Sequence, residues 1–121
     1  MAREKPTRIQ VSQDGDVTVV QLNDRRILDE TSIAEIGEMI YALVPKAQPP
    51  KFVVDFANVA HMSSSALGML ITLHKRIRER GGELRLCGIQ PAILEVFVIT
   101  RLNEIFQIAP TREQAIQSLK S

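Results

Sequence analysis

The sequence of 121 residues has few aromatic side chains: no tryptophan, one tyrosine and four phenylalanines. Proteins that bind single-stranded nucleic acid usually stack bases on aromatic residues, so a function of that kind is not expected. The single cysteine, Cys87, excludes a disulfide within one chain and fits a reducing compartment. No apolar run approaches the roughly 20 residues of a membrane-spanning helix, and the opening MAREKPTRIQ lacks the apolar core of a secretory signal. We therefore expect a cytoplasmic protein without a transmembrane segment.

An excess of charge of one sign is also lacking. The chain has 15 lysines and arginines and 14 aspartates and glutamates, a net charge of +1. Duplex DNA usually requires a clustered basic face, so direct nucleic-acid binding is not expected. His61 and His74 belong to no Cys/His cluster, so neither a metal site nor a cofactor is expected. The length and a hydrophobic share of 45% suit one globular core. We expect a flexible tail at residues 1–7 and one domain over residues 8–120.

The first half of the chain predicts two strands followed by a helix. Apolar residues alternate on both sides of Asp14-Gly15-Asp16, where the glycine can supply a positive φ, and this predicts an antiparallel hairpin. From Asp29 onward, apolar residues recur every three or four positions, which predicts a helix. Ser32 and Glu35 fit the S-x-x-E capping box at the start of this helix.

The second half alternates strands and helices. A buried strand is predicted at Phe52–Phe56, a strand of alternating pattern at Glu83–Cys87, and a short strand near residues 105–108. Helices are predicted from the serine run at 63–65 to Gly81-Gly82, from Pro91 to about Ile99, and after Pro110 with Thr111 and Gln114 as the capping pair. The order is β-β-α-β-α-β-α-β-α. Strands separated by helices pair in parallel, so we predict an α/β fold with a mixed central sheet of about four to five strands and helices packed on it.

The stretch HMSSSALG at positions 61–68 joins the buried strand to the long helix. In α/β proteins, function often lies where the carboxyl end of a strand leads into the next helix. Serine at a helix start most often serves as an N-cap, worth about 1 kcal/mol. A phosphate on such a serine would be held by free N–H groups and the helix dipole, and it would add about −1.5 to −2 charges. The junction therefore suits either a simple cap or a reversible charge switch.

A catalytic serine is a remote third alternative, because His61 and Asp55 lie close to the serines in the sequence. The G-x-S-x-G motif of α/β-hydrolases is absent, however, and closeness in sequence does not make a catalytic triad. We therefore expect no enzymatic activity.

The order of elements and the serine junction together resemble the STAS domain of anti-sigma factor antagonists. The resemblance extends from about Arg8 to Leu119, and its most specific part runs from VVDF to RLNEIF. A strand that ends in Asp55 leads to a motif of the D-S-S-G-L-G type, followed by a long helix and Gly81-Gly82. A further strand and a helix that ends in Thr100-Arg101-Leu102 complete the pattern. The resemblance implies the STAS fold over residues 8–120.

By this resemblance the phosphorylatable serine is Ser64. The positions that match the rest of the motif are Ser65, Leu67 and Gly68. Ser63 stands where the family has aspartate, which removes a charge beside the acceptor and makes Ser63 the second choice for phosphorylation. Ala66 stands where the family has glycine, and we expect its methyl group to lie where a kinase active site would approach.

The resemblance implies a regulatory binding domain without chemistry of its own. The unphosphorylated domain would bind a serine kinase that also acts as an anti-sigma factor, and so free the sigma factor. Phosphorylation would break this complex, and a phosphatase would reset it. The expected partner-binding residues are Asp24, Arg25 and Arg26 in one loop, together with Ser63, Ser64, Ser65, Leu67 and Gly68. The sequence leaves the oligomeric state open.

Some features favour other interpretations. The departures at Ser63 and Ala66 favour a STAS module without a phosphoswitch, a scaffold or subunit of a larger assembly that is either stressosome-like or a lipid-transport complex. Four basic residues near the end of the long helix suit the helix dipole and solubility, with partner docking as the alternative. They are Lys75, Arg76, Arg78 and Arg80. The apolar helix ILEVFVIT predicts either burial or, on an exposed side, an oligomer or partner contact.

Overall fold

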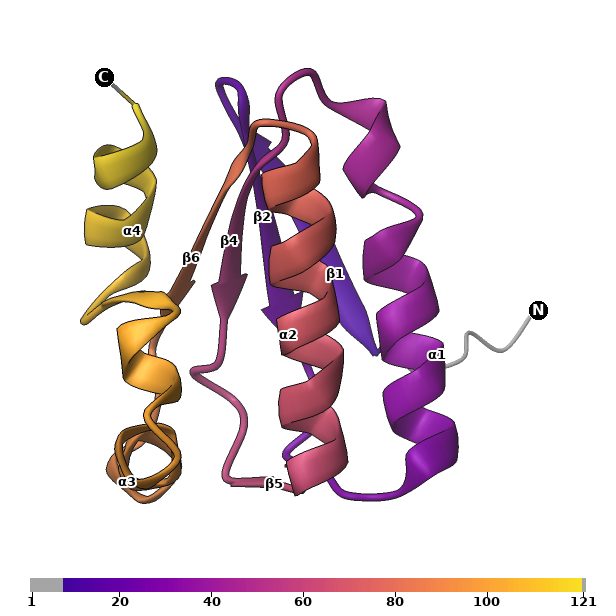
Figure 1. Ribbon diagram of the computed structural model, residues 1–121, viewed down its shortest axis with the longest axis vertical. Helices are drawn as coiled ribbons and strands as arrows, with labels where there is room; N and C mark the ends of the chain where they lie inside the picture. Colours follow the sequence, from indigo (N-terminus) through magenta and orange to yellow (C-terminus); the bar gives the residue numbers. More distant parts are fainter. Residues whose placement is uncertain (1–7, 121) are drawn as a thin grey trace, which may run out of the picture.

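A mixed sheet of five strands, in the order β1-β2-β4-β6-β7, forms the centre of the computed structural model, which describes residues 8–120 (Figure 1). Its strands are β1 (Ile9–Asp14), β2 (Val17–Leu22), β4 (Lys51–Asp55), β6 (Glu83–Cys87) and β7 (Gln107–Ala109). β1 and β2 pair antiparallel through a hairpin in which Gly15 has a φ of 64°. The other neighbours pair in parallel, which confirms the predicted mixed sheet. The tail expected at residues 1–7 lies outside the described residues.

Helices cover both faces of this sheet (Figure 1). α1 (Glu30–Tyr41) and α2 (Ser64–Glu79) lie side by side on one face, and α4 (Arg112–Leu119) covers the other. α3 (Pro91–Ile99) follows β6, and short 3-10 turns, η1 (Val44–Lys46) and η2 (Leu102–Glu104), follow α1 and α3. Among residues 8–120, no helix is both long and apolar enough to cross a bilayer.

The alternation of side chains along each strand creates two hydrophobic clusters, one on each face of the sheet. Toward α1 and α2, the fully buried side chains of Val20, Phe52 and Leu86 meet the apolar stripes of both helices. Toward α4, a smaller cluster is formed by Val17, Val19, Val53, Cys87, Ala115, Ile116 and Leu119. The central strand β4 is therefore buried on both faces, as the continuous apolar run at Phe52–Phe56 predicts.

The start of α1 differs from the prediction. Asp29 is the N-cap residue, and its carboxylate accepts the Ser32 N–H at 3.0 Å. Glu35 instead accepts a hydrogen bond from Arg8 Nε at 2.8 Å. The predicted Ser32–Glu35 capping box is wrong, because an aspartate three residues earlier caps as well as serine does and its charge suits the positive end of the helix dipole. The hydrogen bonds from Ser32 lower the pKa of Asp29.

Two very short strands form a separate parallel pair beyond the carboxyl ends of the main strands. They are β3 (Arg26–Ile27) and β5 (His61–Met62), and strands of this length leave no periodicity in the sequence. The last strand begins at Gln107, because η2 occupies the segment before it. The range of α3 and the Thr111 cap of α4 match the predictions.

Candidate functional site

The β3–β5 pair holds the serine run against the loop that follows β2. The backbone N–H groups of Ala60 and His61 both donate to the Arg25 carbonyl, at 2.8 and 3.1 Å. The Ser63 N–H donates to the Ile27 carbonyl at 3.0 Å. These bonds bring the loop that contains Asp24, Arg25 and Arg26 beside the start of α2. Two segments that are far apart in the sequence thus form one surface.

The three serines have different environments at the start of α2. Ser63 is the N-cap residue with an extended backbone, but its Oγ is buried and has no hydrogen-bond partner within residues 8–120. A buried hydroxyl without a partner costs about 1–3 kcal/mol. Ser64 and Ser65 are the first two residues of the helix, and both are exposed. An enzyme can therefore reach the hydroxyl groups of Ser64 and Ser65, whereas Ser63 Oγ is shielded from solvent.

The start of α2 favours a negative charge. The first N–H groups of a helix lack intrahelical acceptors, and the helix dipole places partial positive charge there. No acidic residue lies in the first turn of α2. Arg25 and Arg26 are exposed and form no ion pair within the described chain, whereas Asp24 binds Arg8 Nη1 at 2.7 Å. The free polar groups of this surface are therefore mainly donors and cations, which suit a phosphate.

Two residues of the serine motif lie in the core. Ala66 is fully buried and Leu67 is 8% exposed, and both belong to the cluster beneath α2. The prediction that the Ala66 methyl group faces an approaching kinase is wrong, because the helix turns this position toward the sheet. Gly68 is exposed, and a Cβ at its position would meet no atom within 4 Å. The accessible part of the motif consists of Ser64, Ser65 and Gly68.

A groove between α1 and α2, called here the α1–α2 groove, begins beside the serines. It has a volume of about 330 Å³ and is lined largely by small residues of both helices, among them Ala34, Gly37, Ser65, Gly68 and Thr72. The Tyr41 hydroxyl donates to the Met69 carbonyl at 3.1 Å and joins the two helices along this groove. Ser65 therefore faces a hollow, while Ser64 precedes it at the tip of the helix.

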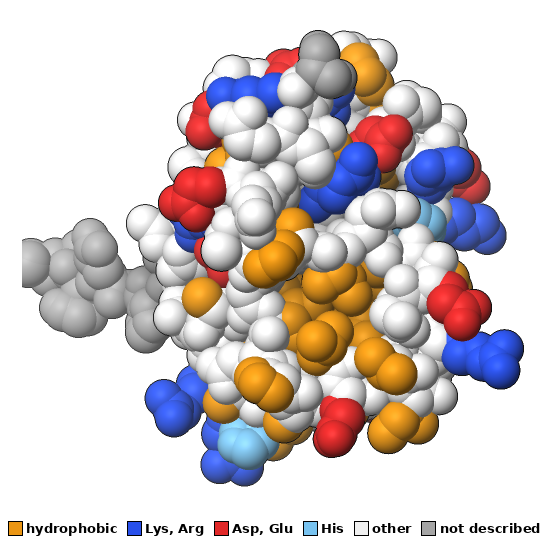
Figure 2. Space-filling view, turned by 90° about the vertical axis from the view of Figure 1, so that its left-hand side faces the viewer, with side chains coloured by type: hydrophobic (Ala, Val, Ile, Leu, Met, Phe, Trp, Pro, Cys, Tyr) orange, Lys and Arg blue, Asp and Glu red, His pale blue; other side chains and the backbone are white. Residues whose placement is uncertain are grey.

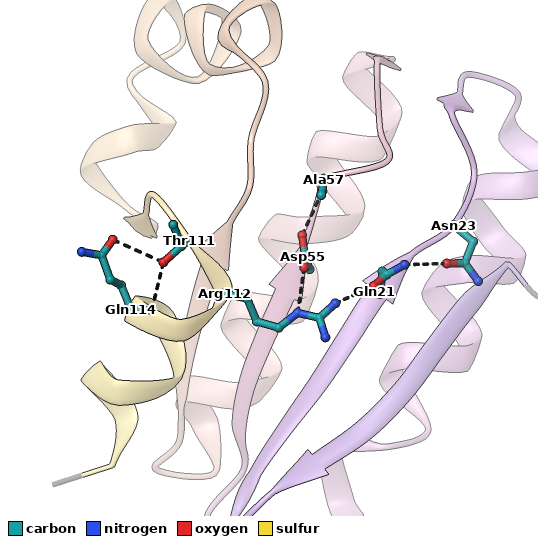
Figure 3. A network of polar contacts seen from close by, with 7 residues as sticks. All are labelled: Gln21, Asn23, Asp55, Ala57, Thr111, Arg112 and Gln114. Atoms are coloured by element: carbon teal, nitrogen blue, oxygen red, sulfur yellow. Dashed lines mark hydrogen bonds and ion pairs between the residues drawn. The ribbon is translucent and has the colours of Figure 1, made fainter.

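A polar network on the opposite face of the sheet holds the start of the loop that leads to the serines (Figure 3). One carboxylate oxygen of Asp55 accepts from Arg112 Nε at 2.8 Å, and the other accepts the Ala57 N–H at 2.9 Å. Arg112 Nη2 also donates to the side chain of Gln21, whose amide donates to Asn23 at 3.2 Å. The network joins α4 to the ends of β2 and β4. Sequence reasoning missed Arg112, although a buried aspartate at a strand end signals that a partner is needed.

This network also separates the residues of the hydrolase alternative. Asp55 shares its face of the sheet with Val53 in the cluster beneath α4, whereas the serines belong to α2 on the other face. Arg112 and Ala57 bind the Asp55 carboxylate, and His61 is exposed without a side-chain hydrogen bond in the described part of the chain. The structure does not assemble a catalytic triad from these residues. The described residues also contain no group of three or more His, Cys, Asp or Glu side chains able to hold a metal ion.

The α3 side of the molecule presents an apolar surface (Figure 2). Ile93 and Phe97 face the core, but other apolar side chains of α3 are exposed, and Ile99 is 77% exposed. A hollow of about 440 Å³ beside them is lined by Ile89, Leu94, Ile108, Ala109 and Pro110. The apolar helix is therefore buried on one side only.

These observations define the class of protein: an α/β domain whose serine-bearing helix start forms one surface with a neighbouring loop. The family model of the STAS domain matches residues 8–115. The chain belongs to the STAS domain family.

Three known proteins show the extent of the similarity. The anti-sigma-B factor antagonist of Bacillus subtilis (strain 168) is 30% identical over 98 residues, which cover 81% of this chain and 88% of that protein. The structure of an anti-sigma-factor antagonist (STAS) domain protein from Planctomyces limnophilus has a TM-score of 0.83 at 29% identity, covering 93% of this chain and 98% of that one. The phosphorylated form of Bacillus SpoIIAA has a TM-score of 0.70 at 19% identity, covering 93% and 99%, and shares the fold.

Proposed function

We propose that the protein is an anti-sigma factor antagonist that is switched by phosphorylation of Ser64. One observation carries this proposal: Ser64 is exposed at the first helical position of α2, on the surface that the β3–β5 pair builds. The 30% identity to the anti-sigma-B factor antagonist of Bacillus subtilis supports the choice of partner class. The proposed partner is a serine kinase that doubles as the anti-sigma factor, and the proposed site of action is the cytoplasm.

The environments of the three serines favour Ser64 as the acceptor. Ser63 Oγ is buried and reaches no kinase without a local rearrangement. Ser65 is exposed but lines the α1–α2 groove. Ser64 lies at the tip of the helix, outside that lining. This order agrees with the position that the family resemblance assigns.

In the proposed reaction, Ser64 Oγ attacks the γ-phosphorus of ATP bound to the kinase. A new O–P bond forms as the bond to the leaving ADP breaks, and the hydroxyl proton passes to a base of the kinase. The free N–H groups and the dipole of α2 stabilise the product within this chain. The phosphate adds about −1.5 to −2 charges to the packed interface, where desolvation and repulsion weaken the complex. Hydrolysis by a phosphatase restores the serine.

The second candidate is a STAS scaffold or assembly subunit without a phosphoswitch. Two observations favour it: the family's aspartate and glycine are replaced by Ser63 and Ala66, and α3 presents an exposed apolar side. In this alternative the partner would bind permanently, and the serines would act only as structural residues at the start of α2 and on its surface.

The deciding experiment treats the purified protein with ATP and an anti-sigma factor kinase from the same organism, then maps the phosphate by mass spectrometry. We expect the phosphate on Ser64, loss of modification in Ser64→Ala, and normal modification in the matched variant Ser65→Ala. Ser64→Asp should weaken kinase binding by about tenfold or more, equivalent to about 1.4 kcal/mol. Kinase binding that is unchanged in Ser64→Asp would refute the switch and support the scaffold. Ester hydrolysis that depends on Ser64 and His61 would refute both.

A further inference from the structure

A second hollow lies at the other end of the α1–α2 pair and is lined by cations. It has a volume of about 570 Å³. Tyr41, Val44 and Pro45 line it from the end of α1 and from η1, and Thr72, Lys75, Arg76, Glu79 and Arg80 line it from α2. It is called here the basic groove. Its α2 residues are Thr72, the pair Lys75 and Arg76, and the pair Glu79 and Arg80, which recur about once per helical turn and so form one stripe of the helix.

The cations of the basic groove have no ion-pair partners in the described chain. The ion pairs within residues 8–120 use the side chains of Arg8, Lys51, Arg85, Arg112 and Lys120. No carboxylate of the described residues lies within 4.0 Å of Lys75, Arg76 or Arg80, although Glu79 belongs to the same stripe. The chain has nearly equal numbers of acids and bases, so this clustering is not a consequence of overall charge.

The helix dipole accounts for only part of this arrangement. Arg76 and Arg78 both lie in the last turn of α2, where the dipole favours cations, but only Arg76 lines the groove. Arg76 and Arg80 are four residues apart on one side of the helix, a spacing at which like charges repel. The Arg76 guanidinium lies 4.4 Å from the centroid of the Tyr41 ring, which orients it on the groove wall. The fold thus brings cations close together although they repel one another.

The basic groove continues toward the serine site. Tyr41 and Thr72 line both the basic groove and the α1–α2 groove, so the two hollows adjoin. Together, the linings of the two hollows extend along α2 from Ser65, past Gly68, to Arg80. Glu38 lines the half near the serines, whereas Lys75, Arg76 and Arg80 line the other half together with Glu79. α1 lies beside the half of α2 that begins at the serines, and the segment with η1 lies beside its other end (Figure 1).

From this charge pattern we propose that the basic groove docks an acidic segment of the protein that acts on Ser64. Carboxylates of that segment would pair with Lys75, Arg76 and Arg80. A membrane surface fits less well, because the cations line a hollow between helices and are not arranged on a flat or convex face. Nucleic acid also fits less well, because the aromatic ring of Tyr41 is already covered by Arg76. The docking of an acidic segment is inferred from the groove itself, and only the identity of the partner rests on the proposed function.

The test uses an acidic peptide and the folded, full-length protein. The probe is an acetylated, amidated helix-forming peptide of alanine and glutamate, and its control has glutamine in place of glutamate. Binding is followed by NMR on ¹⁵N-labelled protein at about 50 mM and about 300 mM NaCl. We expect the largest shifts at Tyr41, Thr72 and Lys75, an affinity about tenfold lower at high salt, and no binding of the glutamine peptide.

Two matched double variants distinguish binding in the groove from a general effect of the protein's net charge on peptide binding. Lys75→Gln with Arg80→Gln should weaken peptide binding about fivefold or more. Arg78→Gln with Arg101→Gln removes the same charge from exposed residues outside the groove and should leave binding unchanged. Absence of binding, or an equal loss in both double variants, would overturn the proposal. Tighter binding to phosphatidylserine vesicles, or displacement of the peptide by an equal concentration of inorganic phosphate, would overturn the choice of a peptide. These assays involve neither ATP nor Ser64, so they stand apart from the phosphorylation test.

Discussion

The two faces of the central sheet are built differently. The face beneath α1 and α2 buries a large, almost entirely apolar cluster that reaches from Ile9 to Phe106. The face beneath α4 buries a small cluster, and a polar network centred on Asp55 holds the end of α4 there (Figure 3). The serine-bearing helix therefore lies on the more extensively packed face. The first face supplies rigidity to the site, while the second attaches α4 through a few specific contacts.

The largest expected effect comes from opening a cavity beneath α2. Leu70 is fully buried in the large cluster, so Leu70→Ala should lower the free energy of unfolding by about 3–4 kcal/mol. Leu119, in the small cluster at the end of α4, should cost about 2 kcal/mol when replaced by alanine, because that helix end can relax into the space. Urea unfolding of both variants measures the difference. Equal losses would show that the two faces contribute equally to stability.

The next effect comes from removing the carboxylate that ties α4 to the sheet. Asp55→Ala should lower the free energy of unfolding by about 1–3 kcal/mol, because Arg112 and the Ala57 N–H lose their acceptor. This loss is smaller than the loss from breaking a fully buried ion pair, since the Arg112 side chain is 34% exposed and water can solvate it. A double-mutant cycle with Arg112→Met should give a coupling of about 1 kcal/mol. A coupling near zero would show that the ion pair adds nothing to the attachment of α4.

On both faces the sequence predicted local elements better than contacts between distant residues. Short-range signals sufficed for the five strands of the main sheet as they follow one another along the chain. They also sufficed for α3, which begins at Pro91, and for the cap of α4 at Thr111. Near α1, Asp29 and Ser32 are both good cap residues, so local sequence did not decide between them. Arg112 and Asp55 are separated by 57 positions, and no local pattern links them.

The candidate site was only partly predictable for the same reason. The resemblance selected the serine run, but the burial of Ser63 Oγ and Ala66 depends on how α2 sits against the sheet. The β3–β5 pair, which joins the two loops, consists of two residues on each side and leaves no pattern. The basic groove needed the relative position of α1 and α2, although its cations are plain in the sequence.

Two glycine substitutions should have smaller effects on stability, of opposite sign, and they test the comparison of the two faces further. Gly68, on α2, faces open space in which an added Cβ would meet no atom within 4 Å, so Gly68→Ala should stabilise the protein by about 0.5–1 kcal/mol. Gly88, at the end of β6, has a φ of 67°, and a Cβ there would lie 2.8 Å from Asp55 Oδ1. Gly88→Ala should therefore destabilise the protein by about 1–2 kcal/mol. Thermal unfolding of the two variants measures both signs, and stabilisation by Gly88→Ala would contradict the close fit around Asp55.

The smallest expected effect is a dependence on pH that belongs to the α2 face. The His74 ring packs edge-on against Phe106, with centroids 5.4 Å apart, and its Nδ1 is buried without a hydrogen-bond partner in the described residues. Burial, and then the charge of Arg78, lower the pKa of His74. On the α4 face, burial and the charge of Asp55 raise the pKa of the Cys87 thiol to about 12, so that thiol does not titrate near neutrality.

The sign of the His74 effect follows from these contacts. His74 binds a proton more readily in the unfolded chain than in the folded chain. The stabilising contribution of the neutral ring is therefore complete above about pH 6.5. It is lost as the pH falls from there through the lowered pKa of His74 in the folded state. The free energy of unfolding, measured in urea between about pH 7.5 and about pH 5, should therefore decrease on acidification. His74→Phe keeps an aromatic ring against Phe106 and should flatten this decrease, whereas His61→Gln at the exposed β5 should leave it unchanged. An unaltered slope in His74→Phe would show that the acid sensitivity arises elsewhere than beneath α2.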